Sequence, residues 1–185
     1  VRVVPPRELL IVGNTGDDLD LYGLHVSPDL DTVMYTLAGM VNESTGWGVR
    51  DDTYHALNML SSLGCETWFR LGDKDLATHM VRTKLLKEGM TLSQVTAQLC
   101  AMVRVRADIV PMTDQTVRTK IVTDGRTLDF QEYFVRNQTE DRVMDVVFEG
   151  ASVAEPSPGI VEALAKAERI IICPSNPILS IAPML

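Results

Sequence analysis

Aspartate is concentrated in one short stretch near the start of the chain, between Gly13 and Thr32. Its five aspartates are Asp17, Asp18, Asp20, Asp29 and Asp31. Carboxylates that converge can hold a magnesium ion, which prefers hard oxygen ligands. A simpler interpretation exists for Asp29 and Asp31, since acidic residues in the first turn of a helix complement its dipole. For the whole set, with glycines between its members, we favour a ligand-binding site.

The elements on either side of this acidic stretch predict where it lies. The run Leu9–Val12 is short, apolar and closed by Gly13, which is typical of a buried parallel strand. Ser27 and Pro28 then predict a helix, with serine as the N-cap and proline at the first helical position. Its apolar positions recur at helical spacing: Leu30, Val33, Met34, Leu37 and Val41. The aspartates are therefore expected at the carboxyl end of a strand, where open α/β sheets bind ligands.

A second loop of the same kind is predicted near the end of the chain. The run Arg169–Cys173 has the composition of another buried strand, and it leads directly into the loop Pro174–Pro177. Backbone amides of that loop, with the side chains of Ser175 and Asn176, could meet the ligand that the aspartates bind. Alternatively, serine, asparagine and proline occur there only as ordinary turn residues.

Helical periodicity predicts most of the middle of the chain. We expect helices over 53–62 and 91–103, a short strand over 66–71, and a long helix that follows residues 72–75 and reaches about Lys87. The core face of the long helix is predicted to consist of Leu76, Ala77, Met80, Val81 and Leu85. The opposite stripe is Asp75, His79 and Arg82. Such a stripe usually faces solvent, but beside a pocket it could contact phosphate or carboxylate groups.

From Asp108 onward the apolar period changes from that of a helix to that of a strand. Strands are predicted over 109–112, 117–122 and 127–135, with Asp124 and Gly125 as a hairpin turn, and 143–148 extends this antiparallel part. A helix over 156–166 follows. Together these elements predict a single α/β domain over 1–185, with a Rossmann-like, mostly parallel sheet flanked by helices. A small antiparallel hairpin subdomain is inserted at about 108–149.

Composition limits the classes of partner. A length of 185 residues corresponds to about one domain. The net charge of -8 argues against nucleic acid as a partner, because phosphate backbones require a basic surface. No apolar run approaches the roughly 20 residues that span a bilayer, so no membrane is expected. The three cysteines lack metal-ligand spacing, which favours reduced thiols in the cytoplasm.

Sequence motifs for covalent or zinc-dependent catalysis are absent from the chain. It contains no G-x-S-x-G, H-E-x-x-H, C-x-x-C or Walker A run, and its three histidines are not spaced as a zinc site. The remaining means of catalysis are positioning and the neutralisation of charge. These are what a phosphoryl-type transfer chiefly needs.

Several runs, spread over nearly the whole chain, resemble one family in its order. They are residues 14–18, 23–32, 47–48, 71–79, 111–114, 130–132 and 174–177. Among them, Gly23–Thr32 reads GLHVSPDLDT and Pro174–Pro177 reads PSNP. The pattern resembles the 2-phospho-L-lactate transferases of deazaflavin coenzyme F(420) biosynthesis.

This resemblance implies a magnesium-dependent transferase. A guanosine-diphosphate-activated donor would pass a phospholactyl group, or a phosphoenolpyruvyl group in bacteria, to the deazaflavin precursor Fo and release GMP. Asp31 and Arg70 are the positions implied to contact Fo, and Asp31 is the carboxylate expected to orient or deprotonate the attacking hydroxyl. Asp18 and Asp29 are implied as magnesium ligands. The family also implies a homodimer.

Further contacts are expected from the loops. Asn14 and Thr15, with Ser175 and Asn176, are the expected nucleotide- or phosphate-binding residues. Trp47 could stack on the flat ring of Fo. Equally, a tryptophan between two glycines could simply cover its own loop.

Members of this family open with a strand and a glycine-rich loop and continue beyond the second loop. We therefore expect this chain to be a fragment that lacks both parts. Two alternatives stay open: a nucleotide-sugar-binding regulatory protein of the related gluconeogenesis-factor family, and a non-catalytic α/β domain. The run Pro28–Asp31 after the acidic loop favours the transferase. Lactyl and enolpyruvyl groups differ only in a small pocket, so the sequence leaves the choice of acid open.

Overall fold

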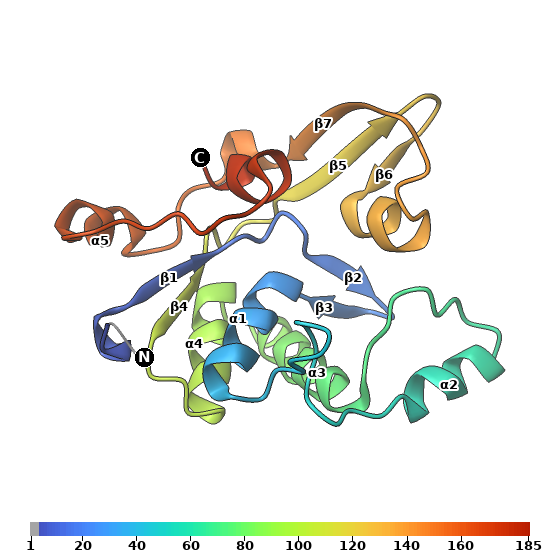
Figure 1. Cartoon of the computed structure of the whole chain (residues 1–185), viewed down its shortest axis with the longest axis horizontal. Coiled ribbons are helices and arrows are strands. Elements are labelled where there is room, and N and C mark those ends of the chain that lie inside the picture. The colour runs from blue at the N-terminus through green and yellow to red at the C-terminus, as the bar shows by residue number, and fades with distance from the viewer. Residues whose placement is uncertain (1–3) are drawn as a thin grey trace.

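The computed structural model describes residues 4–185. At its centre, strand β1 (Leu10–Gly13) pairs in parallel with β4 (Asp108–Pro111) over four residue pairs. The pair lies between a layer of helices and a separate antiparallel sheet (Figure 1). The predicted α/β fold, with parallel strands, flanking helices and a small antiparallel sheet, is confirmed. The strand expected to begin the antiparallel insertion instead belongs to the parallel pair.

Three helices form the layer on one side of the parallel strands: α1 (Pro28–Ala38), α3 (Asp73–Lys87) and α4 (Leu92–Met102). Their shared core contains the buried side chains of Leu30, Met34, Tyr35, Leu85, Val95 and Leu99. Helix α4 begins with a capping box, in which the Thr91 hydroxyl accepts from the backbone of Gln94 and the Gln94 side chain accepts from the backbone of Thr91. All three helices lie where the periodicity predicts them.

Helix α1 begins at Pro28, as predicted, but its N-cap hydrogen bond is absent. The predicted cap, Ser27, donates its hydroxyl to Asp18 Oδ2 at 2.9 Å instead of accepting from the helix backbone. The helix ends at Gly39, whose φ of 69° terminates it in the left-handed conformation. The Ser27 side chain therefore stabilises the acidic loop through Asp18 and does not cap the helix.

The face that α3 turns inward differs from the predicted one, although Leu85 and Leu76 pack inward as predicted. Met80 and Val81, assigned to the core, are exposed, whereas the stripe Asp75, His79 and Arg82 is buried. The prediction of a solvated stripe was wrong because Asp31 on α1 supplies a charged partner for it. Periodicity defines two faces but does not say which one meets the neighbouring helix.

A small hairpin that the sequence analysis did not predict follows the acidic loop. Strands β2 (Leu19–Leu21) and β3 (Leu24–Val26) are joined by Tyr22 and Gly23, with φ of 53° and 73°. Positive φ at both central residues is the geometry of a type I′ hairpin turn. The strand predicted over 66–71 was wrong, since this segment is irregular and Leu71 packs against the hairpin without pairing with it.

The antiparallel sheet has the order β6-β5-β7. Its strands are β5 (Arg118–Thr123), β6 (Thr127–Asp129) and β7 (Val143–Glu149). The predicted turn at Asp124 and Gly125 joins β5 to β6, and Gly125 has a φ of 110°. The return strand is shorter than predicted, because residues 132–136 form a helical turn.

The remaining helices are short. They are α2 (His55–Ser62), α5 (Ile160–Lys166), η1 (Pro6–Glu8), η2 (Glu132–Arg136), η3 (Ala151–Val153), η4 (Pro177–Ile181) and η5 (Ala182–Met184). Helix α2 matches the predicted helix over 53–62, and α5 forms only the second half of the helix predicted over 156–166. Within residues 4–185, no helix has both the length and the apolar character needed to cross a membrane.

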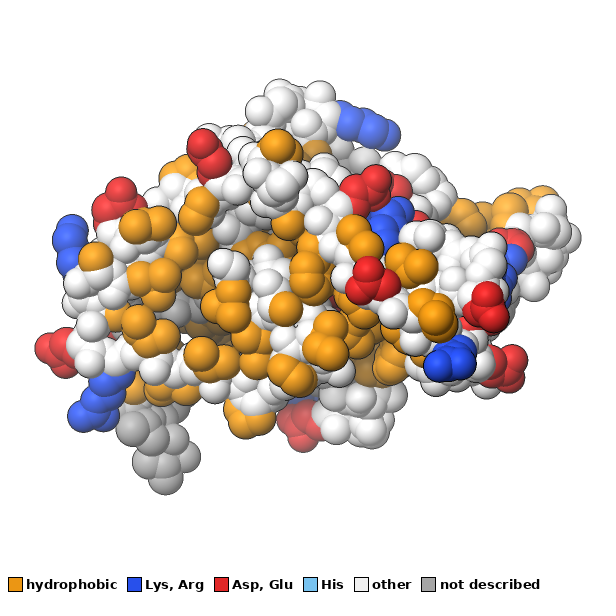
Figure 2. Space-filling model, turned by 90° about the horizontal axis from the view of Figure 1, so that it is seen from above, with side chains coloured by type: hydrophobic (Ala, Val, Ile, Leu, Met, Phe, Trp, Pro, Cys, Tyr) orange, Lys and Arg blue, Asp and Glu red, His pale blue; other side chains and the backbone are white. Residues whose placement is uncertain are grey.

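The buried strand predicted over Arg169–Cys173 does not form. Ile170, Ile171 and Ile172 are 63%, 77% and 67% exposed, and none of the pairings recorded for residues 4–185 involves this run. An apolar segment forms a strand only when an adjacent strand satisfies its backbone N–H and C=O groups. β-Branched residues alone are therefore not sufficient. Figure 2 shows the resulting face of the molecule, on which hydrophobic side chains gather.

The buried side chain of Leu30 on α1 should contribute strongly to stability. Leu30→Ala should lower the free energy of unfolding by about 2–5 kcal/mol, because Leu30 is only 1% exposed and its removal leaves a cavity. Leu37→Ala, on the exposed side of the same helix, should change it by less than about 0.5 kcal/mol. Urea unfolding of both variants measures this, and equal losses would contradict the packing described.

Candidate functional site

The loop after β1 folds back on itself, so that its polar side chains are buried. Asn14 Oδ1 accepts from the backbone N–H of Gly16 at 2.9 Å, and Asn14 Nδ2 donates to Asp29 Oδ2 at 3.2 Å. Thr15 and Asp18 are closed into the same turn by a backbone hydrogen bond of 3.2 Å. Of the expected site residues, Asn14, Thr15, Asp18 and Asp29 are thus brought together at the carboxyl end of β1.

The backbone of this loop is held against the antiparallel sheet at Gly16. The Thr119 N–H on β5 donates to the Gly16 carbonyl at 2.7 Å. A Cβ at position 16 would lie 2.7 Å from Thr119 Oγ1 and 3.4 Å from Pro183 Cβ. Only glycine allows so close an approach. The acidic loop therefore contacts both β5 and the end of the chain.

Asp18 is the most enclosed carboxylate of the loop. Its Oδ2 accepts from Ser27 Oγ at 2.9 Å and lies 3.0 Å from His25 Nε2 on β3. Its Oδ1 is buried without a hydrogen-bond partner. Burial raises the pKa of Asp18, while His25, Ser27 and the positive charge of Arg82 oppose the rise. The unpredicted hairpin thus supplies His25 as a contact for Asp18.

Asp17, Asp18 and Asp29 are close enough to repel one another. The pKa of Asp17 is raised to about 7, first by burial and then by the negative charge of Asp29. Burial also raises the pKa of Asp29, and Asp18 adds to that rise. Three carboxyls that disfavour their own ionised forms would all be relieved by one nearby cation.

Unpartnered buried atoms mark the same place. Asp17 Oδ1, Asp18 Oδ1, Thr15 Oγ1 and Thr119 Oγ1 are buried and have no hydrogen-bond partner. Buried polar atoms are rarely left in this condition in native proteins. All four are hard oxygen donors of the kind that bind magnesium. The donor atoms are thus of the kind that a divalent cation takes, although within residues 4–185 Asp17, Asp18 and Asp29 are not among the side chains whose ligand atoms lie within 4.8 Å of one another.

Asp31 lies apart from this loop group, in an ion pair between two helices. Arg82 Nη1 on α3 donates to Asp31 Oδ2 at 3.0 Å, and Arg82 Nη2 donates to Asp31 Oδ1. Both side chains are almost fully buried. Arg82 also lies near enough to Asp18 for each charge to act on the pKa of the other. Arg82 is therefore the cation common to the acidic loop and to Asp31.

The ion pair continues into a buried network with His79, Asp75 and Tyr35. Ligand atoms of Asp31, Asp75 and His79 lie within 4.8 Å of one another, which is a spacing that metal sites share. Arg82 Nη1, however, lies within 3.1 Å of both Asp31 and His79. Because the guanidinium already supplies positive charge there, we assign this group as an ion-pair network. The sequence analysis did not predict this network, because the polar stripe on one helix does not show which residue of another helix pairs with it.

The other expected site residues lie on the surface. Arg70 is exposed, with its guanidinium carbon 4.5 Å from the centre of the Tyr54 ring, and Trp47 is 44% exposed. Ser175 and Asn176 are also exposed. Asn176 Oδ1 accepts from the backbone of Ile178 and Leu179, so it caps the turn that follows. The structure leaves these four side chains open to solvent and does not join them to the acidic loop.

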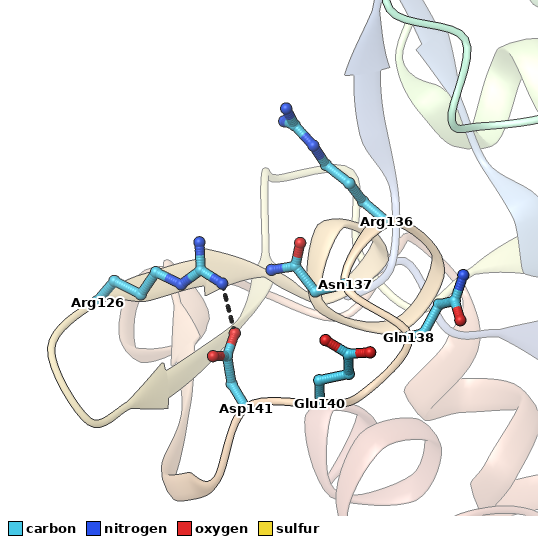
Figure 3. Close-up of a pocket in the computed structure, with 6 residues that line it drawn as sticks. All are labelled: Arg126, Arg136, Asn137, Gln138, Glu140 and Asp141. Carbon is cyan, nitrogen blue, oxygen red and sulfur yellow. Dashed lines mark hydrogen bonds and ion pairs between the residues drawn. The ribbon is translucent and has the colours of Figure 1, made fainter.

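A polar pocket of about 240 Å³ lies elsewhere, on the antiparallel sheet (Figure 3). Its six lining residues are Arg126, Arg136, Asn137, Gln138, Glu140 and Asp141. Arg126 is paired with Asp141 at 2.6 Å, and Arg136 is paired with Glu66 and Glu132. Its arginines are thus already neutralised, and none of the expected site residues lines it.

Comparison with known proteins places the chain among relatives. It is 43% identical over 189 residues to a phosphoenolpyruvate transferase of Streptomyces avermitilis, covering 100% of this chain and 59% of that protein. It is 42% identical over 188 residues to a 2-phospho-L-lactate transferase of Methanocaldococcus jannaschii, covering 100% of this chain and 60% of that protein. The chain therefore spans about three fifths of the length of these relatives.

A solved structure shares the fold. A UPF0052 family member from Bacillus halodurans matches 95% of this chain and 53% of its own, with a TM-score of 0.61 and 12% identity. At that identity the likeness concerns the fold alone. The family model of 2-phospho-L-lactate transferase CofD matches residues 3–185. The chain belongs to the 2-phospho-L-lactate transferase CofD family.

Proposed function

We propose that this protein transfers a phospholactyl or phosphoenolpyruvyl group from a guanosine-diphosphate-activated donor to the deazaflavin precursor Fo, with release of GMP. Family membership and the names of the relatives support the transfer. The observation that carries the proposal is the gathering of Asn14, Asp17, Asp18 and Asp29 at the carboxyl end of β1. Such an oxygen-rich loop suits a phosphorylated ligand held through a cation.

Asp18 and Asp29 are the proposed magnesium ligands, and the structure adds Asp17 as a third candidate. Their raised pKa values and unpartnered oxygens support this assignment. When bound, magnesium supplies positive charge that offsets the charge of the bridging phosphates. Asn14 orients Asp29 through its amide, and Ser27 and His25 orient Asp18.

Asp31 is the proposed catalytic carboxylate. It accepts the proton of the Fo side-chain hydroxyl while the hydroxyl oxygen attacks the phosphorus that carries the three-carbon acid. The bond from that phosphorus to the oxygen of GMP breaks, and GMP leaves with the bonding electrons. General-base assistance of this kind accelerates a reaction by about 10²- to 10⁴-fold.

The exposed residues have binding roles in this proposal. Trp47 and Arg70 are free to contact the flat ring of Fo, because both are open to solvent. Thr15 contacts phosphate from the acidic loop, and Ser175 and Asn176 contact the nucleotide. The proposed assembly is a homodimer, which analytical ultracentrifugation of the full-length protein tests directly.

Transfer by the full-length protein tests the function. With magnesium, Fo and each activated donor, we expect a phosphodiester product and one GMP for each product, measured by mass spectrometry. Absence of product with both donors, together with binding of a UDP-sugar, would overturn the proposal in favour of a regulatory protein.

Asp31→Asn should lower kcat by at least about 100-fold, because it removes the proton acceptor. Asp124→Asn is the matched control, since Asp124 is an exposed aspartate in the hairpin turn between β5 and β6, outside the acidic stretch. Steady-state kinetics and circular dichroism are measured on both variants. Turnover by a folded Asp31→Asn variant at the native rate would remove Asp31 from the mechanism.

The raised pKa of Asp17 predicts a pH dependence of stability. Because its folded pKa of about 7 exceeds the 3.8 that is ordinary for aspartate, the folded state binds the proton more tightly than the unfolded state. The resulting stabilisation is complete below about pH 4 and is lost as pH rises through 7, by up to about 1.4 kcal/mol per pH unit.

Asp17→Asn should remove this slope, so without magnesium the variant gains stability over the native protein as pH rises from 5 to 8. Urea unfolding at each pH measures the difference, with Asp124→Asn as the control. Parallel pH profiles for Asp17→Asn and the native protein would show that Asp17 ionises normally. Magnesium at pH 8 should stabilise the native protein more than the Asp17→Asn variant.

A further inference from the structure

Arg82 is buried more deeply than an arginine ordinarily is. Its side chain is 1% exposed, and it lies in the interface between α3 and α1. A buried guanidinium requires close partners, because its desolvation is costly. Asp31 meets this need with both carboxylate oxygens, one on each terminal nitrogen of the arginine. This two-point contact fixes the plane of the carboxylate as well as its position.

Arg82 is itself held by a chain of polar contacts. Its Nη1 lies 3.1 Å from His79 Nδ1. Arginine has no acceptor atom, so His79 Nδ1 must accept and the ring proton lies on Nε2. That nitrogen lies 3.3 Å from Asp75 Oδ1 without forming a hydrogen bond to it. The Tyr35 hydroxyl donates to the same Asp75 oxygen at 2.8 Å.

The chain of contacts links α1 to α3 at two points. Tyr35 and Asp31 lie one turn apart on α1, while Asp75, His79 and Arg82 lie along one face of α3. Starting from Tyr35, the contacts therefore run across to α3, along it, and back to α1. The contacts thus begin and end on α1, and Asp31 and Tyr35 are joined only through the helix backbone. Two points of contact with α3 restrict the side chains of α1 more than a single ion pair would.

The orientation of Asp31 matters because so little of it is reachable. Its side chain is 5% exposed, so a substrate hydroxyl can meet only a small part of the carboxylate. A rotation about the Cβ–Cγ bond would change which part of the carboxylate is presented. Misplacement by about 1 Å can cost 100-fold in rate.

We propose that Arg82 is a positioning residue, which, held by His79, Asp75 and Tyr35, fixes the plane in which Asp31 presents its oxygens to the attacking hydroxyl. The inference rests on the proposed transfer reaction. Proton acceptance by Asp31 does not by itself require Arg82, His79, Asp75 or Tyr35. The inference gives these four side chains a part in catalysis. A purely structural ion pair would join the two helices equally well with a less constrained carboxylate.

Arg82→Lys tests the proposal, because lysine keeps the charge and loses the planar fork. In the full-length protein we expect kcat to fall by about 100-fold while KM for both substrates changes little. Lys84→Met is the matched control: Lys84 lies on the exposed face of the same helix and pairs only with Glu88 at the surface. It should leave kcat unchanged.

A double-variant cycle separates positioning from stabilisation. In the Asp31→Asn background, Arg82→Lys should cause no further fall in kcat, because no carboxylate remains to be positioned. A structural role would instead lower the rate by the same factor in both backgrounds. That additive result would overturn the proposal.

Tyr35→Phe provides a second variant, which keeps the ring and removes only the hydrogen bond to Asp75. If Arg82→Lys does not fold, Tyr35→Phe decides: kcat should fall by about tenfold with KM unchanged. If Arg82→Lys folds, a native kcat in that variant would overturn the positioning role. If it does not fold, a native kcat in Tyr35→Phe would do so. Either result would leave the transfer function intact. An inactive native protein would overturn both.

Discussion

The buried ion pair between Asp31 and Arg82 is the interaction on which the arrangement of the helices depends. Two charges removed from water are costly, and they are tolerated only with good geometry and further hydrogen bonds. Here the guanidinium contacts both carboxylate oxygens and His79, although its Nε is buried without a hydrogen-bond partner. The ion pair also sets which face of α3 meets α1.

The sequence predicted the elements with strong local signals. Pro28 marks the start of α1, Thr91 forms a capping box, and Asp124 with Gly125 makes the hairpin turn. The prediction was wrong where the outcome depends on a distant neighbour. The inward face of α3 is chosen by Asp31, fifty-one positions away from Arg82, and no local pattern contains that information. The apolar run 169–173 is likewise a strand only if another segment pairs with it.

The residues of the candidate site also fall into those that local sequence predicted and those that depend on distant segments. The end of β1 and the start of α1 were both predicted, which was sufficient to place Asn14, Asp18 and Asp29 near one another, although the hairpin between Asp18 and Asp29 was not predicted. Local sequence did not predict His25 or Thr119, which reach the loop from a hairpin and a separate sheet. Burial raises the pKa of Asp17 and of Asp29, and a neighbouring carboxylate adds to each rise. The arrangement of the acidic loop thus disfavours the ionised form of its carboxyls, a condition common in functional sites.

The close approach at Gly16 has a mechanical consequence. The Thr119 N–H donates to the Gly16 carbonyl, and a side chain at position 16 would meet both Thr119 and Pro183. A tilt of β5 would therefore move Gly16, and with it Asp17 and Asp18 on the next residues. The geometry of the acidic loop is thus coupled to the position of the antiparallel sheet through one glycine.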